Sequence, residues 1–238
     1  MTQLILTEIT RMGPGRCIIG LEAIPAGYRS VRPLPRYGNS WPEDFPHRRG
    51  HQLEFQLATL SPTRPHIEDR LTLRFVRKVG ECGEEELVQR LRRAEMADRL
   101  HDLFHCQVHH NPTGRGYFVE PADAARSICG TELRNLRFFP HGDEIRAELL
   151  LPDETRVKLP LVDTEWRRFL EQAASLIIGA NQKRRMERFL LSRLPQKLLG
   201  EPTLLARIGV TRPFMGKCWL MLDSLFPQPK EEWLHEMD

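Results

Sequence analysis

The sequence predicts a mostly β fold with helices (α+β), made of two small β-barrels with intervening helices. Residues 51–60 and 71–79 alternate apolar and polar side chains with the period of a half-buried strand. Eighteen prolines and sixteen glycines interrupt the 238-residue chain often, which favours many short strands. The expected elements run strands, helix, strands, helix, strands, whereas a parallel α/β sheet needs a helix after nearly every strand. A short barrel with a helix among its strands is typical of OB-like Greek-key barrels.

The N-terminal half, residues 1–106, is predicted to hold the first barrel and the helix that follows it. Its strands are expected at residues 4–9, 17–20, 28–32, 51–60 and 71–79. On the last strand, Leu71, Leu73 and Phe75 share one face. A Gly-Pro-Gly turn separates the first two strands, and a proline-rich loop spans residues 33–50. Residues 84–104 have leucines at near-helical spacing after three glutamates, which indicates a helix.

The C-terminal half, residues 107–238, is predicted to hold the second barrel with a long inserted helix. Its strands are expected in a run ending at residue 139 and at 145–151, 155–161, 204–210 and 218–226. Thr164 fits a helix N-cap, and the helix is expected to continue to about residue 194, where Pro195 ends it. An Arg-Pro-Phe-Met-Gly turn separates the last two strands, and the polar tail after Pro227 is expected to be loose.

Composition limits the class of protein. Lys and Arg exceed Asp and Glu by 35 to 32, and this weak positive excess permits nucleic-acid binding without requiring it. The five cysteines are scattered without a CxxC pair, and the N-terminus has no secretory signal, so we expect reduced thiols in a cytoplasmic protein. No apolar run approaches the roughly 20 residues that span a bilayer, so we expect no membrane segment.

Three segments of the N-terminal half go beyond periodicity. They are Thr7-x-x-Thr10-Arg11 with its glycine turn and Cys17-x-x-Gly20, then Ser30-Val-Arg32-Pro33, then Arg64-Pro-His66-Ile67-Glu68-Asp69. In this order they resemble the dual OB-containing domain, a family of paired OB-fold barrels from prokaryotic conflict and defence loci. The resemblance covers residues 3–79 and departs at Ile67, where we expect a threonine. It implies tandem OB folds, a nucleic-acid-sensing role, no catalytic activity, and helicase or nuclease partners encoded nearby.

Basic and aromatic residues of the same half form a candidate nucleic-acid site. Arg11 and Arg16 flank the glycine turn, where backbone amides and guanidinium groups can reach phosphates. Arginines interleaved with aromatic rings suit single strands, because bases stack on the rings while the charges follow the backbone. The candidate contacts are Thr10, Arg11, Arg16, Tyr28, Arg29, Arg32 and Trp41. The alternative for each of them is a structural hydrogen bond or ion pair.

A histidine with two nearby carboxylates can form a metal or acid–base site, and His66, Glu68 and Asp69 have that composition. No second ligand pair at a defined spacing accompanies them. We therefore expect a structural signature in which Glu68 or Asp69 pairs with Arg11 or Arg32 across the barrel.

A second histidine-rich segment follows the first predicted helix. Its members are His101, His105, Cys106, His109 and His110. Zn²⁺ favours His and Cys, and His at i and i+4 share a helix face. The cluster is local and stands at a helix end, where histidines also interact well with the helix dipole. Both interpretations stay open, and no metal is predicted.

The densest basic run lies in the long predicted helix. It contains Lys183, Arg184, Arg185 and Arg188, followed by Arg193 and Lys197. Arg184 and Arg188 are four residues apart and share a helix face. Such a run forms either a phosphate-contacting stripe or an ordinary solvated face.

The predicted function is a non-catalytic sensor or adaptor that binds DNA or RNA, single-stranded or otherwise non-B-form, within a prokaryotic conflict or defence system. No GxxxxGK[ST], GxGxxG, GxSxG or HExxH is present, so an ATPase, dinucleotide enzyme, serine hydrolase or zincin is unsupported, and no cofactor is expected. One alternative is a protein-interaction scaffold for a partner helicase or nuclease. Another is a metal-dependent nuclease built on the histidine clusters.

Overall fold

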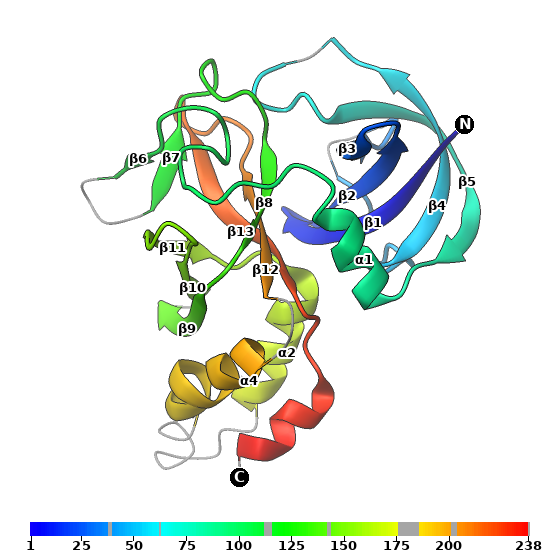
Figure 1. Ribbon diagram of the computed structural model, residues 1–238. Coiled ribbons are helices and arrows are strands. Elements are labelled where there is room, and N and C mark those ends of the chain that lie inside the picture. The colour runs from blue at the N-terminus through cyan, green and yellow to red at the C-terminus, as the bar shows by residue number, and fades with distance from the viewer. Residues whose placement is uncertain are drawn as a thin grey trace.

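The computed structural model describes residues 1–37, 40–61, 63–111, 116–141, 144–175, 186–200 and 204–237. Strands dominate these residues, which confirms the prediction of a mostly β, α+β fold. Figure 1 shows two β-rich halves side by side, with the N-terminal half on the right. In the described part of the chain, no helix is both long enough and apolar enough to cross a membrane.

The N-terminal half is a closed five-stranded barrel. Its strands are β1 (Thr2–Met12), β2 (Gly15–Ile24), β3 (Gly27–Leu34), β4 (His51–Thr59) and β5 (Asp69–Glu81). They close in the order β1-β2-β3-β5-β4, with β3 and β5 parallel and the other pairs antiparallel. Alternate residues on these strands point inward and form an apolar core that includes Leu4, Ile18, Val31 and Phe55. The five predicted N-terminal strands are therefore confirmed.

Two local features of this barrel depend on close packing. Gly13 has φ +55°, which the tight β1–β2 turn requires. A Cβ on Gly15 would lie 2.2 Å from the carbonyl oxygen of Trp41, so only glycine lets the loop before β4 close over this end of the barrel. The β4–β5 ladder contains three register shifts. They interrupt the predicted alternation along β5: Thr72 is buried and Leu73 is 41% exposed, while Phe75, 37% exposed, still pairs with the core residue Phe55 at a ring-centroid distance of 5.4 Å.

The C-terminal half contains two sheets. Their strands are β6 (His109–His110), β7 (Tyr117–Val119), β8 (Ile128–Glu132), β9 (Asn135–His141), β10 (Glu144–Leu150), β11 (Arg156–Pro160), β12 (Leu205–Val210) and β13 (Cys218–Phe226). One sheet has the order β11-β10-β9 and the other the order β6-β7-β13-β12-β8. The described strands therefore do not form a single continuous second barrel. The break between the two sheets lies at Leu133 and Arg134, between β8 and β9. The backbone N–H of Leu133 donates to the carbonyl of Leu204, just before β12, and that of Arg134 donates to the carbonyl of Leu150 on β10.

The two C-terminal sheets nevertheless enclose one core. Leu161, just after β11, forms a parallel bridge with Leu222 of β13, and Val162 N donates to the Leu222 carbonyl at 3.0 Å. On the other side, only two residues separate β8 from β9. Cys129 and Ile208 from one sheet and Phe138 and Leu149 from the other belong to the same buried cluster. The sheets therefore curve toward each other around shared apolar side chains.

The helix between the halves is shorter than predicted. Helix α1 (Glu84–Leu91) packs Leu87 and Leu91 against the N-terminal barrel, while Leu103 and Phe104 are buried in the C-terminal core. The residues after α1 form turns and bends instead of a continuing helix, and they bring Leu103 and Phe104 into the second core. The expected domain boundary at residue 106 lies after these two C-terminal core residues.

The second helical region also differs from expectation. Helix α2 (Thr164–Ser175) begins as predicted, but Asp163 caps it: its Oδ1 accepts from Glu165 N and Trp166 N at 2.9 and 3.1 Å. Helical structure is also present from residue 186 through the π-helical turn η1 (Phe189–Arg193) to the end of α4 (Leu194–Gly200). Pro195 does not end it: the π-helical turn directly before α4 bonds the Leu194 N–H to the Phe189 carbonyl, and the helix continues past Pro195 to Gly200.

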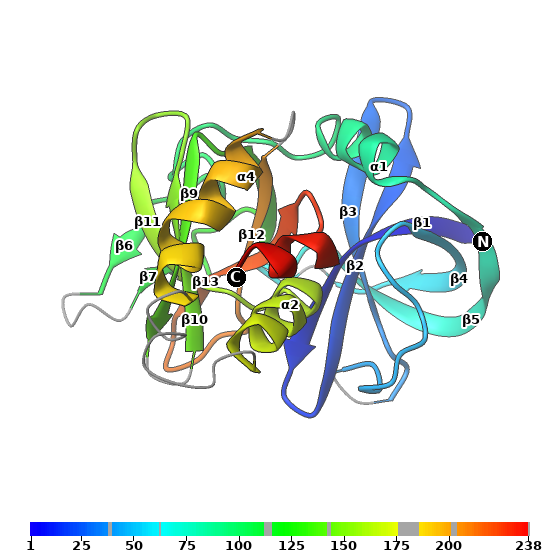
Figure 2. The same cartoon turned by 90° about the horizontal axis from the view of Figure 1, so that it is seen from below.

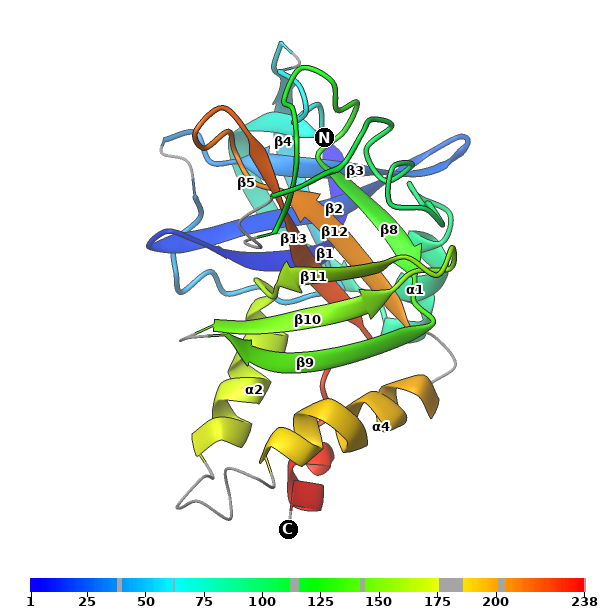
Figure 3. The same ribbon diagram turned by 90° about the vertical axis from the view of Figure 1, so that its left-hand side faces the viewer.

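The C-terminal tail is ordered by apolar packing. The 3₁₀ helix η2 (Glu231–Met237) buries Trp233, whose ring centroid lies 6.1 Å from that of Trp166. The expectation of a loose tail was therefore wrong. Figures 1 and 3 show α2, α4 and η2 gathered below the C-terminal sheets, whereas α1 lies against the barrel.

Candidate nucleic-acid interface

A buried polar layer joins the two halves and accounts for several of the predicted site residues. We call this layer the seam and define it by Arg32, Arg49 and Arg207 with their partners. Arg207 of β12 is fully buried, and its Nε donates to Glu8 Oε1 of β1 at 2.7 Å. Its other nitrogens contact the Ser30 hydroxyl and, at 3.4 Å, the Glu95 carbonyl. A C-terminal arginine thus neutralises an N-terminal carboxylate.

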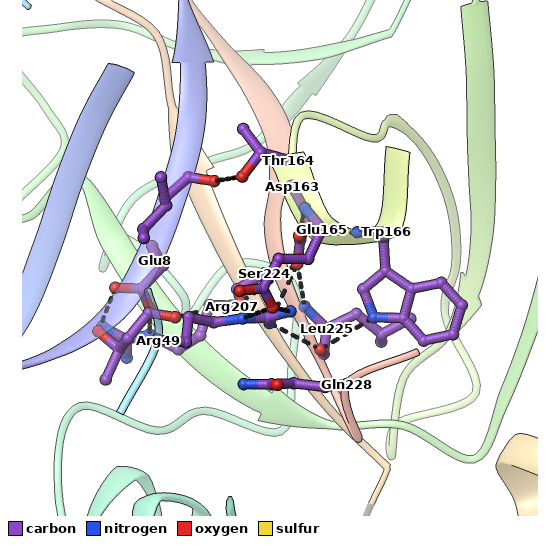
Figure 4. A network of polar contacts seen from close by, with 12 residues as sticks. Glu8, Arg49, Asp163, Thr164, Glu165, Trp166, Arg207, Ser224, Leu225 and Gln228 are labelled. Carbon is purple, nitrogen blue, oxygen red and sulfur yellow. Dashed lines mark hydrogen bonds and ion pairs between the residues drawn. The ribbon is translucent and has the colours of Figure 1, made fainter. Parts of the chain in front are cut away.

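Arg49 makes the reciprocal contacts. Figure 4 shows its guanidinium between Asp163, Ser224 and Leu225 of the C-terminal half. Nη1 lies 3.2 Å from Asp163 Oδ2, 2.7 Å from Ser224 Oγ and 3.1 Å from the Leu225 carbonyl. Nε donates to Glu165 Oε2 at 2.7 Å. A buried arginine with all of these acceptors is neutralised and hydrogen-bonded, which is the condition for placing it in an interior.

The His66, Glu68 and Asp69 signature belongs to the same layer. Arg32 is only 5% exposed, and its Nη1 lies 3.0 Å from Asp69 Oδ1 and 2.9 Å from His66 Nδ1. Its Nη2 donates to Ser127 Oγ at 2.9 Å. The Glu68 carboxylate accepts from Ser127 N and Oγ at 2.9 and 2.7 Å. Of the pairings expected for the signature, Arg32 with Asp69 is present. Arg32 was wrongly placed among the nucleic-acid contacts, because its guanidinium is enclosed.

His66 is unsuited to acid–base work near neutral pH. Burial, together with Arg32 and Arg212, lowers the pKa of His66 to about 3. Its Nδ1 accepts from Arg32, so the ring is neutral with its proton on Nε2. The arrangement supports a fixed hydrogen-bond acceptor inside the seam.

The remaining predicted contacts of the N-terminal half do not gather in one place. Thr10 is buried beside Asp163, and Trp41 packs against Phe45 and Phe55 with its indole N–H on the Pro33 carbonyl at 2.7 Å. Thr10 is therefore enclosed, in correction of the prediction, whereas Trp41 is half-buried and packs against the barrel. The physical reason is that both close one end of the barrel against neighbouring segments.

Tyr28 and Arg29 lie at the other end of the β2–β3 hairpin. The Tyr28 ring stands under Arg90 and Arg93, and Arg29 forms an ion pair with Glu22 at 2.7 Å. Tyr28 pairs with Ala23, seven residues after Arg16 on β2, a separation of about 23 Å along the strand. The structure therefore separates Tyr28 and Arg29 from Arg11 and Arg16.

The predicted basic helix is only partly visible. Lys183, Arg184 and Arg185 lie outside the described residues, and Arg188 is exposed just before η1. The structure therefore places one member of the proposed stripe on the surface.

The histidine-rich segment is spread over a turn and a short strand. His101 contacts Asp102 at 3.1 Å, His105 contacts Arg126, and the His109 ring stacks on Phe118. Across the residues that the structure describes, no three His, Cys, Asp or Glu side chains come together as metal ligands.

Three exposed segments remain on one side of the molecule, and we call them the loop face. They carry Arg11 and Arg16 at the β1–β2 turn, Arg36 and Tyr37 after β3, and Arg212, Phe214, Met215 and Lys217 in the β12–β13 turn. Figures 2 and 3 show these segments along one edge, with the β10–β11 turn at the opposite edge in Figure 3.

Several contacts hold the loop face together. Arg16 exchanges backbone hydrogen bonds of 2.8 Å with Trp41. Arg212 Nη2 lies 2.7 Å from Asp69 Oδ2, so the C-terminal turn is tied to the N-terminal barrel. Burial raises the pKa of the Cys17 thiol, and Arg32 and Arg212 oppose this rise, which places Arg212 close to the start of β2. Sequence reasoning missed Arg212 and Phe214 as surface residues; the Arg-Pro-Phe turn was their only signal.

Comparison with known proteins adds no identity. No family model, no curated protein and no solved structure matches the chain. The resemblance of residues 3–79 to the dual OB-containing domain is therefore still a prediction.

Proposed function

We propose that the protein is a non-catalytic nucleic-acid-binding protein of two OB-like barrels, with the loop face as its contact surface. The loop face is the observation that carries the proposal. It combines arginines and exposed rings, the pair of groups with which proteins follow a phosphate backbone and its bases. Arg32, which the sequence also predicted as a nucleic-acid contact, pairs with Asp69 in the seam and does not belong to the loop face.

The strand order supports the OB-like interpretation. The closed order β1-β2-β3-β5-β4 is that of a five-stranded Greek-key barrel. If β8 and β9 count as one strand broken at Leu133, the C-terminal order β8/β9-β10-β11-β13-β12 repeats it. OB folds bind ligands with the loops that join strands 1 to 2 and 4 to 5. The loop face contains the β1–β2 turn, which is the strand 1 to 2 loop of the N-terminal half. It also contains the β12–β13 turn, which is the strand 4 to 5 loop of the C-terminal half.

The first prediction tests the loop face with a charge-matched control. Arg11→Ala with Arg36→Ala removes two exposed cations, whose loss should flatten the salt dependence of log Kd by roughly 0.7 to 0.9 per phosphate contact. Arg134→Ala with Arg156→Ala removes the same charge beside the β10–β11 turn and should leave binding unchanged. Fluorescence anisotropy against single-stranded and duplex oligonucleotides at two salt concentrations measures both. Equal effects of the two double variants would contradict the assignment of the loop face.

The wider biological role is part of the same proposal and rests on the resemblance. We infer a cytoplasmic sensor or adaptor of a prokaryotic conflict or defence system that works with a helicase or nuclease. A scaffold for such an enzyme is the second candidate, favoured by the exposure of Tyr37, Phe214 and Met215 at 82%, 65% and 82%. Binding to a co-encoded enzyme with no affinity for oligonucleotides would select the scaffold.

A further inference from the structure

The tip of the β12–β13 turn presents an aromatic side chain to solvent. Phe214 and Met215 are 65% and 82% exposed. Phe214 and Lys217 exchange backbone hydrogen bonds of 2.8 and 3.2 Å, which closes a tight turn. Met215 has φ +52°, a left-handed conformation that costs free energy for a residue with a side chain. The fold therefore keeps two large apolar side chains at a tip where solvent would favour polar ones.

The tip is held rigidly by the strands and by the other half. Thr211 N donates to the Trp219 carbonyl at 2.9 Å, and Trp219 N donates to Thr211 Oγ1 at 3.0 Å. Arg212 is fixed by its ion pair with Asp69. A turn whose backbone is held in this way loses little backbone entropy when its exposed ring is covered by a ligand.

Cations precede and follow the exposed ring along the turn. Arg212 precedes Phe214 by two residues, and Lys217 follows it by three, with its Nζ 3.9 Å from the centroid of the Phe118 ring. Arg11 and Arg16 lie on the neighbouring segment of the loop face. An exposed ring in a turn that also carries cations complements a strand that alternates flat bases with phosphates, whereas a purely apolar pocket in a partner protein would gain nothing from the charges.

We propose that Phe214 is a stacking platform for an unpaired base, and that the ligand of the loop face is therefore single-stranded. This inference rests on the proposed nucleic-acid-binding function. In a duplex both faces of each internal base are already stacked, so an exposed ring can cover a base only where the strand is open. The Phe214 ring thus selects the strand type, while the arginines supply attraction that is independent of sequence.

The experiment compares binding of a single-stranded dodecanucleotide and the matching duplex by anisotropy, with 2-aminopurine in the single strand to report stacking. Phe214→Ala should weaken single-strand binding by about 5- to 150-fold, leave the salt slope unchanged and abolish the change in 2-aminopurine fluorescence. Phe214→Tyr should retain affinity and signal, because it keeps the ring. Leu191→Ala, which removes an apolar side chain that is 48% exposed on η1, is the control and should change nothing.

The outcomes separate the two proposals. If Phe214→Ala binds as tightly as the unaltered protein while Arg11→Ala with Arg36→Ala binds more weakly, the stacking platform is wrong and the proposed function stands. Equal losses on single-stranded and duplex probes would also overturn it. If the unaltered protein binds neither probe at low salt, both proposals fall.

Discussion

Asp223 is a buried carboxyl group of the seam with no arginine of its own. Arg32, Arg49 and Arg207 pair with Asp69, Asp163 and Glu8 respectively. The β12–β13 register shifts beside Arg207 and leaves Asp223 as the extra residue of a bulge. Within the described part of the chain, Asp223 Oδ1 has no hydrogen-bond partner. Gly209 makes room for this carboxyl group, because a Cβ there would lie 2.0 Å from Asp223 Oδ2.

The pKa of Asp223 gives the seam a pH dependence. Burial raises it to about 7; Arg32 and Arg207 oppose the rise, while Glu8 and Asp163 add to it. Because the pKa is higher in the folded than in the unfolded chain, the protonated carboxyl stabilises the fold fully below about pH 4. This contribution is lost as the pH rises through about 7.

The second prediction follows because ionisation of Asp223 destabilises the folded protein. Asp223→Asn cannot ionise, so it should match the unaltered protein in free energy of unfolding near pH 4. It should become relatively more stable as the pH rises to 8, by on the order of a few kcal/mol. Urea denaturation of both proteins at pH 4.5, 6, 7 and 8 measures the difference. A difference that does not vary with pH would contradict the raised pKa.

At the scale of elements, Asp163 shows how one side chain serves both a helix and the seam. Its Oδ1 caps α2, and its Oδ2 accepts from Arg49, from Ser224 Oγ and from Leu225 N. The start of α2 is thereby tied to β13 and to the N-terminal barrel. Thr164, which we expected as the cap, instead donates to the Ile9 carbonyl of β1 at 2.8 Å.

The third prediction separates the two roles of Asp163. Asp163→Asn keeps a capping oxygen but removes the charge opposite Arg49, and Asp163→Ala removes both. Asp163→Ala should be the less stable of the two by about 1 kcal/mol, the usual contribution of a cap. Both should be less stable than the unaltered protein, because each leaves a buried arginine with fewer acceptors. Chemical denaturation of the three proteins at one pH gives the comparison, and equal stability of the two variants would argue against the capping role.

At the scale of the whole molecule, the seam makes the two halves depend on each other. Arg49 of the N-terminal half needs Asp163, and Arg207 of the C-terminal half needs Glu8. In either half alone, these charged side chains would have no partner of opposite charge. The loop face depends on the same joint, because Arg212 of one half is held by Asp69 of the other.

The fourth prediction is cooperative unfolding of both halves. Arg207→Met leaves Glu8 buried without its cation and should lower the free energy of unfolding by about 3–5 kcal/mol. Hydrogen exchange should then accelerate in β1–β5 and in β8–β13 together. Arg29→Met, which breaks an exposed ion pair, is the control and should change stability by less than about 0.5 kcal/mol. Faster exchange confined to β12 and β13 would show that the halves unfold separately.

The sequence by itself determined most of the strands and the mostly β class. Period-two alternation and glycine or proline turns are local properties, so they located β1–β5, β10 and β11, and the hairpin of β12 and β13. The sequence also indicated that Glu68 or Asp69 pairs with Arg11 or Arg32, and the structure has one of these pairs, Arg32 with Asp69.

The tertiary structure alone decided which charges are enclosed and which are exposed. Arg11 and Arg32 look alike in the sequence, but β1 ends at the surface where Arg11 stands, whereas Arg32 faces Ser127 from the other half. The length of α1, the order of the tail and the exposure of Phe214 depend in the same way on packing between residues far apart in the chain. Local propensity is weak beside such long-range burial, which is why the loop face emerged only when the two halves were placed together.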